Sequence, residues 1–195
     1  MRGPSVVAMA ATDPSETCEY ASQVAYENGA LMCTTAAVYW GLSCVCEIVP
    51  PMCSRPQMQL LMKTAAATHG TILHLRPSGL DNTLQQHEVL RCIAKPCAVH
   101  ADELYGYCAA KSPDMAAFLH ESDIFDMLRP CESLLLTGGG HTTALYRDCA
   151  GRLFSYDSLP ARVSEVKTAA ALRQDLRVSH RNMQQFTATH LRLRV

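Results

Sequence analysis

The sequence has little net charge and no long apolar run. Its 17 lysines and arginines nearly balance 18 aspartates and glutamates, for a formal net charge of −1. This balance excludes the broad basic surface with which a nucleic-acid-binding domain attracts phosphates. No segment approaches the roughly twenty consecutive apolar residues that a membrane helix needs. Internal repeats and low-complexity linkers are also absent, so we expect one compact domain with neither nucleic acid nor a membrane among its partners.

The composition is that of a chain with a substantial core. Of 195 residues, 48% are hydrophobic and 18% are charged, which is typical of a folded globular domain. The first apolar stretch is short and is broken by Thr12, Asp13 and Pro14, so it does not have the length of a signal peptide. We expect residues 1–12 to form a flexible leader and residues 13–195 to form the domain.

Cysteine is abundant, but its spacing indicates neither a metal site nor a disulfide scaffold. Disulfide scaffolds belong to short chains with weak cores, whereas several of these ten cysteines lie within apolar patterns. Cys44 and Cys46 are separated by one residue, not by the two of a zinc knuckle, and Cys53 has no partner at ligand spacing. We therefore expect mostly free thiols, a reducing compartment (cytoplasm or nucleus), no metal and no cofactor.

The order of the predicted elements indicates an α+β fold. Helical or apolar patterns predict helices first, and alternating patterns predict most strands after residue 130. The predicted helices cover residues 13–27, 33–46, 57–69 (with Gly70 as its cap), 80–94, 113–128 and 162–176. The predicted strands cover residues 71–75, 97–99, 133–137, 141–146, 152–156 and 186–195.

Cys33 stands where a polar, glycine-containing approach meets a dense apolar run. The run is long enough for a buried helix, so Cys33 should lie at or near the helix N-terminus. The unpaired N–H groups and the positive end of the helix dipole favour a thiolate there. A nucleophile needs this geometry, although a small apolar residue capping a core helix would give the same pattern.

A predicted β-hairpin places a histidine and a carboxylate together. His141 begins one strand, and Asp157 ends the next strand sixteen residues later. Antiparallel strands lie about 5 Å apart, so the two side chains can hydrogen-bond, and the carboxylate can orient the imidazole. Each residue alone is ordinary, but together with Cys33 they predict a thiolate–imidazole pair with a carboxylate partner. Residues 138–140, all glycine, would let a substrate backbone approach closely.

At these residues the chain resembles the papain-like cysteine proteases, and more narrowly their small deubiquitinating branches. Josephin-type enzymes are similar in size, in the 108-residue gap from Cys33 to His141 and in the acid-Ser-Leu segment 157–159. Herpesvirus tegument deubiquitinases are similar in residues 29–33 and the apolar helix that follows, and along the hairpin. The resemblance covers about residues 20–50 and 130–195.

The resemblance implies a papain-like fold, with N-terminal helices on a C-terminal antiparallel sheet. It also implies a hydrolase that cleaves ubiquitin or ubiquitin-like C-terminal peptide or isopeptide bonds, and for the tegument branch a place in the virion tegument. Cys33 would be the nucleophile, His141 the base and Asp157 its orienter, while Gly138, Gly139 and Gly140 would line the substrate cleft.

Two departures from these families leave alternatives open. Both branches use an upstream Gln as oxyanion donor, for which this chain offers Asn28, five residues before the cysteine, and Gln23, ten before. We expect Asn28, because a five-residue loop can fold its side chain back toward the helix start. The tegument enzymes also place a His two residues after the strand-ending Asp, where Leu159 stands here. An inactive papain-like scaffold that binds a partner, or a papain-like amidase or transglutaminase, are the alternatives.

Overall fold

In this computed structural model the described residues are 17–26, 29, 32–75, 99–106, 128–138, 140–179 and 186–193. They form a seven-stranded antiparallel sheet, three α-helices and one short 3-10 helix. In chain order the elements are β1 (Thr17–Glu19), η1 (Gln23–Ala25), α1 (Cys33–Val45), α2 (Arg55–Leu75), β2 (Val99–Gly106), β3 (Glu132–Gly138), β4 (His141–Arg147), β5 (Leu153–Asp157), β6 (Arg162–Val166), α6 (Ala169–Ser179) and β7 (Phe186–Leu193).

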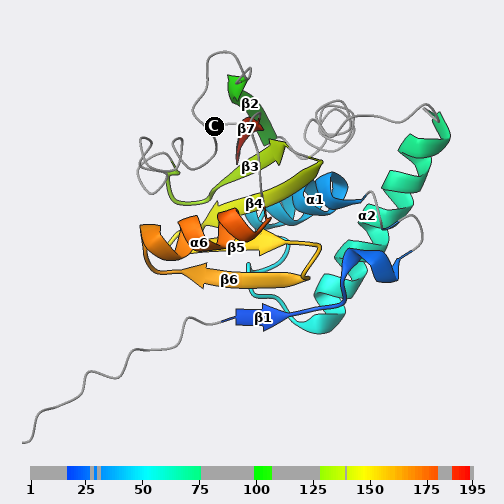
Figure 1. The fold of residues 1–195 in the computed structure, drawn as a ribbon, viewed down its shortest axis with the longest axis horizontal. Coiled ribbons are helices and arrows are strands. Elements are labelled where there is room, and N and C mark those ends of the chain that lie inside the picture. The colour runs from blue at the N-terminus through cyan, green and yellow to red at the C-terminus, as the bar shows by residue number, and fades with distance from the viewer. Residues whose placement is uncertain are drawn as a thin grey trace, which may run out of the picture.

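The sheet lies between helices on its two faces. Its strand order is β1-β6-β5-β4-β3-β7-β2, with every neighbouring pair antiparallel. Helices α1 and α2 belong to the core cluster on one face, and α6 belongs to a second cluster on the other (Figure 1). Along β3 the side chains alternate between these clusters, since Leu135 belongs to the first and Leu134 and Leu136 to the second.

Helix α1 is buried on nearly all sides because it is apolar on nearly all sides. It contacts β3, β4, β5 and β7 across the sheet, and it also contacts α2. Gly41 lets this helix approach the sheet closely, because a Cβ at that position would stand 2.8 Å from the hydroxyl oxygen of Ser133. Such a helix belongs in the interior of the domain, as its sequence predicts.

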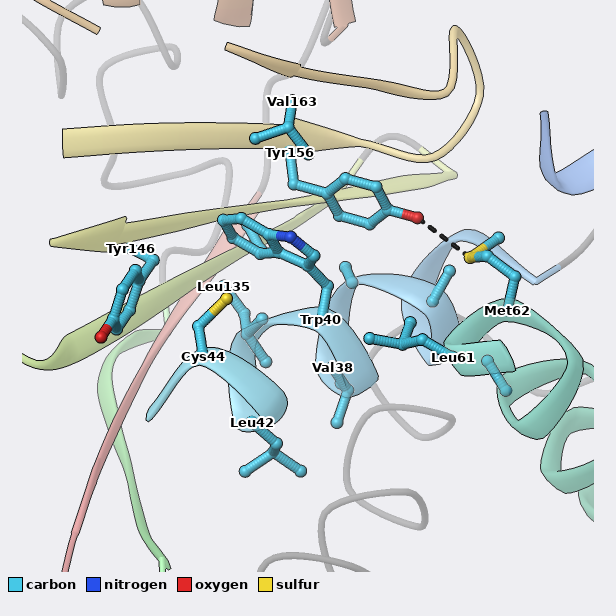
Figure 2. Close-up of a cluster of buried hydrophobic side chains, with 14 of the residues drawn as sticks. Val38, Trp40, Leu42, Cys44, Leu61, Met62, Leu135, Tyr146, Tyr156 and Val163 are labelled. Carbon is cyan, nitrogen blue, oxygen red and sulfur yellow. Dashed lines mark hydrogen bonds between the residues drawn. The ribbon is translucent and has the colours of Figure 1, made fainter. Parts of the chain in front are cut away.

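Trp40 of α1 is the central side chain of the core between this helix and the sheet (Figure 2). Its ring is fully buried and stacks on Tyr156 with centroids 5.1 Å apart, while Tyr146 meets it edge-on at 6.4 Å. The indole N–H donates to the Pro51 carbonyl, and the Tyr156 hydroxyl donates to the sulfur of Met62 on α2. The aromatic cluster therefore ties α1 to β4, β5 and α2 at once.

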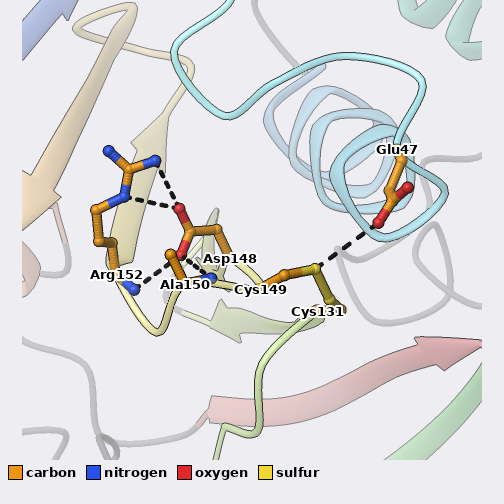
Figure 3. Close-up of a disulfide and its surroundings, with 6 residues drawn as sticks. All are labelled: Glu47, Cys131, Asp148, Cys149, Ala150 and Arg152. Atoms are coloured by element: carbon orange, nitrogen blue, oxygen red, sulfur yellow. Dashed lines mark hydrogen bonds and ion pairs between the residues drawn. A yellow bond between two sulfur atoms is a disulfide. The ribbon is translucent and has the colours of Figure 1, made fainter.

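A disulfide and a polar turn secure one end of the β3–β4–β5 meander (Figure 3). Cys131, just before β3, pairs with Cys149 in the β4–β5 turn, which departs from the expectation of free thiols at these two positions. Asp148 accepts hydrogen bonds from the backbone of Ala150 and from the backbone and side chain of Arg152. The other described cysteines, residues 18, 33, 44, 46 and 53, are not joined in disulfides.

Three sequence predictions of secondary structure are wrong. Residues 13–27 are not a helix where described: they form β1, which pairs with β6, and the short η1. Residues 71–75 are not a strand, because α2 continues through Gly70 to Leu75 and buries Ile72 in the main cluster.

The third error is the helix expected over 162–176. The chain turns at Ala161 with φ 55° and runs back along β5 as β6, burying Val163 and Val166. In this region the helix, α6, covers only residues 169–179. The β-branched residues of 163–166 fit a strand with neighbours on both sides, a context that helical periodicity does not register.

The remaining predicted helices and strands either match elements of the structure or lie outside the described residues. Helix 33–46 and the strands of residues 133–157 and 186–195 are found within a few residues of their expected ends, and β2 begins at the last residue of the expected strand 97–99. The leader, helix 80–94 and helix 113–128 up to residue 127 lie outside the described residues. No helix in the described part of the chain is long and apolar enough to span a membrane.

Candidate active site

The tight β3–β4 hairpin sets the position of His141. Gly138 pairs with His141, so only two residues connect the strands. Gly140 has φ +83°, a conformation that glycine adopts without steric cost. His141 is therefore the first residue of β4, at the edge where α1 begins.

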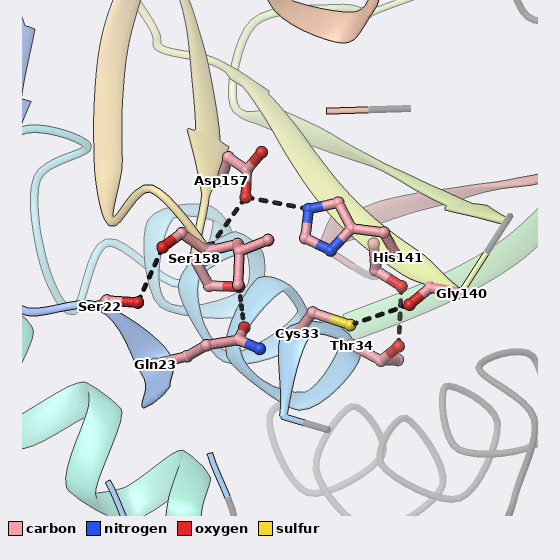
Figure 4. Close-up of polar contacts among 10 residues, drawn as sticks. Ser22, Gln23, Cys33, Thr34, Gly140, His141, Asp157 and Ser158 are labelled. Carbon is pink, nitrogen blue, oxygen red and sulfur yellow. Dashed lines mark hydrogen bonds and ion pairs between the residues drawn. The ribbon is translucent and has the colours of Figure 1, made fainter. Parts of the chain in front are cut away.

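Cys33 is the first residue of α1, as expected, and is only 4% exposed. Its thiol points to the glycine turn and donates to the carbonyl oxygen of Gly140 over 3.9 Å (Figure 4). The first N–H groups of a helix have no partners within the helix. Because Cys33 is the first residue of α1, these backbone donors and the positive end of the helix dipole lie beside it.

His141 and Asp157 are joined across β4 and β5. The β4–β5 register pairs Ala144 with Tyr156, which places Asp157 diagonal to His141 on the same face. The His141 Nε2 atom lies 2.9 Å from Asp157 Oδ1, and the two side chains are 13% and 12% exposed. The same carboxylate oxygen accepts the backbone N–H of Leu159 at 2.9 Å. These contacts fix the plane of the imidazole.

The His141 ring is set up to carry a positive charge. Burial by itself lowers its pKa, but hydrogen bonds to Asp157 and Cys33 and the electrostatic interactions with these two groups outweigh burial and raise the pKa from 6.5 to about 9. In Figure 4 the second ring nitrogen faces the Cys33 side. A histidine held between a carboxylate and a cysteine sulfur has the order of groups that an activated cysteine nucleophile needs.

A buried line of hydroxyl groups aligns the two elements that bear Cys33 and His141. Thr34 follows the cysteine, Thr142 follows the histidine, and their hydroxyl oxygens are 2.7 Å apart. Thr142 also donates to Thr137 on β3 at 3.2 Å. All three are at most 1% exposed, so the helix start and the strand cannot shift against each other without breaking buried hydrogen bonds.

The structure describes some, but not all, of the expected oxyanion donors and cleft glycines. Gln23, in η1, is 2% exposed, and its Oε1 accepts the Ser158 hydroxyl at 2.5 Å. Asn28 lies outside the described residues, so the preference for it stays a prediction. Gly138 and Gly140 lie at the hairpin tip beside the site, while Gly139 lies outside the described residues.

Sequence reasoning missed the supporting hydroxyls, namely Thr34, Thr142 and Ser158. Each directly follows a proposed triad residue in the chain. That adjacency was the available signal, but their pairing across elements depends on the tertiary fold.

One group among the described residues has the composition of a metal site. Glu47, Cys131 and Cys149 bring a carboxylate and two sulfurs within 4.8 Å of one another. The two sulfurs are bonded to each other, and the group lies past the end of β4 opposite His141. It has no part in the chemistry of the site.

A cysteine at a helix N-terminus therefore lies beside a histidine–carboxylate pair carried by two neighbouring strands. No protein-family model matches the chain, and no curated protein sequence matches it. Among solved structures, the chain is similar to the ubiquitin-specific protease encoded by murine cytomegalovirus tegument protein M48, crystallised in complex with a ubiquitin-based suicide substrate. The match has a TM-score of 0.60 and 12% identity, and covers 92% of this chain and 88% of that chain.

This chain therefore has the papain-like α+β fold of a herpesvirus tegument ubiquitin-specific protease, which confirms the resemblance and the fold class expected from the sequence. At 12% identity the likeness establishes the fold alone.

Proposed function

We propose that this protein is a cysteine-dependent hydrolase that cleaves C-terminal peptide or isopeptide bonds of ubiquitin or a ubiquitin-like protein. The observation that carries the proposal is the buried line of contacts from Cys33 through His141 to Asp157. The substrate class is supported by the fold, since the similar M48 protease was crystallised with a ubiquitin-based suicide substrate.

In the proposed acylation step, the Cys33 thiolate attacks the scissile carbonyl carbon and forms a tetrahedral intermediate. The His141 imidazolium then gives its proton to the leaving amine, and the carbon–nitrogen bond breaks to leave a thioester. In deacylation the neutral ring takes one proton from water, which attacks the thioester; Cys33 leaves as the thiolate beside the imidazolium, and the carboxylic acid product loses its proton to solvent. Asp157 holds the ring in one orientation through both steps.

The developing oxyanion needs donors close to Cys33. The backbone N–H of Cys33 at the helix start is one. The Gln23 carboxamide is the second donor that the described residues support, because it is buried and held in place. Each such donor contributes roughly 3–4 kcal/mol in enzymes of this kind.

The glycine turn supplies a wall for an extended substrate tail. A Cβ at Gly140 would have no atom within 4 Å, so the space beside this turn is open, and the Gly140 carbonyl is within reach of the Cys33 thiol. A ubiquitin tail ending in Gly-Gly has no side chains at its end, which suits a close approach along Gly138 and Gly140. In this proposal the protein acts in a reducing compartment or in the virion tegument.

A ubiquitin probe with a C-terminal electrophile tests the proposal. Wild-type protein should form one covalent adduct, which Cys33→Ser should abolish. Cys18→Ser removes a free, half-buried thiol outside the site and should leave labelling intact.

Folded wild-type protein that forms no adduct would instead favour the scaffold alternative. Fast alkylation of Cys33 by a small reagent without ubiquitin labelling would favour an amidase or transglutaminase. Either result would overturn the assignment to ubiquitin.

A further inference from the structure

The turn formed by Asp157, Ser158 and Leu159 contacts both halves of the proposed machinery. Asp157 accepts from the ring of His141, and the Ser158 hydroxyl donates to the side-chain oxygen of Gln23. Ser158 and Gln23 are 1% and 2% exposed, so water does not compete for this hydrogen bond. One turn therefore holds the base on one side and the carboxamide on the other.

The backbone brings Gln23 to Ser158 by extending the pairing of β1 with β6. Beyond Glu19 and Arg162, the last residues of the ladder, the two segments continue in the same register. Three hydrogen bonds continue it: Tyr20 N–H to the Ala161 carbonyl at 2.8 Å, the Ser22 hydroxyl to the Leu159 carbonyl at 2.8 Å, and Gln23 N–H to the Ser158 carbonyl at 3.1 Å. The main chain at Gln23 is thus fixed before its side chain is considered.

The side-chain contact then selects which end of the carboxamide faces the nucleophile. A separation of 2.5 Å lies at the short end of the O–H···O range and below the usual N–H···O range. The Gln23 oxygen is therefore the atom that meets Ser158. Figure 4 shows the carboxamide nitrogen on the side of Cys33.

We infer that Ser158 is a positioning residue that binds the Gln23 oxygen and so directs the carboxamide nitrogen toward the oxyanion that forms at Cys33. The catalytic consequence rests on the proposed function, whereas the structural coupling of Ser158 to Gln23 does not. Because Asp157 is the preceding residue, one short turn orients both the proton-transfer group and the oxyanion donor.

Steady-state kinetics on a ubiquitin C-terminal amide substrate separate this role from simple folding support. Ser158→Ala should lower kcat about five- to tenfold with KM unchanged, the effect of losing one ordinary hydrogen bond in the transition state. Ser158→Thr keeps the hydroxyl and should recover most of the rate. Ser158→Cys keeps the shape with only a weak donor, so it should behave like the alanine variant even if Ser158→Ala fails to fold.

Two controls identify the route of the effect. In a Gln23→Ala background, Ser158→Ala should have no further effect on kcat, because its partner is already gone. Ser155→Ala removes a serine within β5 that is bonded to Asp175 on α6 rather than to Gln23, and it should leave kcat unchanged. Independent, multiplying losses in the double variant would overturn the inference.

A measurement on the side chain itself decides the inference even if no ubiquitin substrate is turned over. The Gln23 side-chain amide signal, assigned by its loss in Gln23→Ala, should be rigid in wild type, with an NMR order parameter near 0.8. It should fall below about 0.6 in Ser158→Ala. It should stay rigid in Ser155→Ala. An unchanged Gln23 signal in Ser158→Ala refutes the positioning role, while absent turnover with this change intact refutes only the proposed function.

Discussion

Replacing Asp157 by Asn isolates the electrostatic part of the His141 contact. Asp157 Oδ1 lies 2.9 Å from His141 Nε2, and the side chains are 12% and 13% exposed. Asparagine has nearly the same shape and keeps an oxygen that can accept from the ring, so packing should change little. What disappears is a buried negative charge beside the imidazole.

The loss of stability expected for Asp157→Asn follows from the raised pKa of His141. Burial lowers its pKa, but contacts with Asp157 and Cys33 raise the pKa from 6.5 to about 9. At about 1.4 kcal/mol per pKa unit, the imidazolium is favoured by roughly 3 kcal/mol. Asp157 and Cys33 produce this net gain against the opposing effect of burial, so we assign at least roughly 1–2 kcal/mol to Asp157.

The sign gives the pH window. A histidine whose pKa is raised on folding stabilises the folded state fully below pH 6.5, and it loses that contribution as the pH rises to about 9. Asp157→Asn should therefore lower the free energy of unfolding by roughly 1–2 kcal/mol at pH 6 and by almost nothing above pH 9.

Urea unfolding at intervals from pH 6 to 9.5 measures this profile, and NMR titration of the His141 ring measures the pKa directly. The ring should titrate near 9 in wild type and closer to 6.5 in the variant. Glu132→Gln is the matched control, because Glu132 forms a second buried carboxylate–histidine pair among the described residues, with His190. It should leave the His141 titration unchanged. A pH-independent penalty, or a wild-type ring that titrates near 6.5, would refute the reasoning.

Three further perturbations test the frame around the site. Thr142→Val leaves the Thr34 hydroxyl without its partner at 2.7 Å, so it should lower the free energy of unfolding in urea by roughly 1–3 kcal/mol. Thr142→Ser keeps a hydroxyl and should cost much less. Equal losses in the two variants would contradict the role of the hydroxyl. Trp40→Leu should lower Tm by about 5–10 °C in calorimetry, because it removes the stacked core ring, and an unchanged Tm would show that the core repacks. Cys149→Ser should destabilise the oxidised protein by about 3 kcal/mol, since it opens the loop that the disulfide with Cys131 closes. Dithiothreitol should lower the Tm of the wild type to that of the variant and should leave the Tm of the variant unchanged.

Much of the site could be predicted because its residues lie at the boundaries of strongly patterned elements. The apolar run after Cys33 has one plausible structure, a buried helix, and α1 begins at that residue. The hairpin around residues 147–151 brings its two far ends together whatever surrounds it, so His141 and Asp157 were expected to meet. Local pattern and antiparallel geometry suffice for such contacts.

The errors fall where a segment has no local reason for its structure. Residues 17–19 are strand because β6 offers an unpaired edge, and residues 162–166 are strand because β5 and β1 pair on either side. Thr71 and Ile72 favour a strand by composition, yet α2 continues through them and buries Ile72 in the main core. Long-range pairing and burial outweigh weak propensities in each case.

Helix α1, the hairpin that joins His141 to Asp157 and the α+β class could be read from the sequence, because each depends on periodicity and turn chemistry within a short stretch. The contacts of Thr34 with Thr142 and of Ser158 with Gln23 depend on how distant segments pack. These pairs are separated by 108 and 135 residues, so no local pattern encodes them. They form because the packing of α1 on β4, and of β1 along β6, places the hydroxyls where buried polar groups need partners.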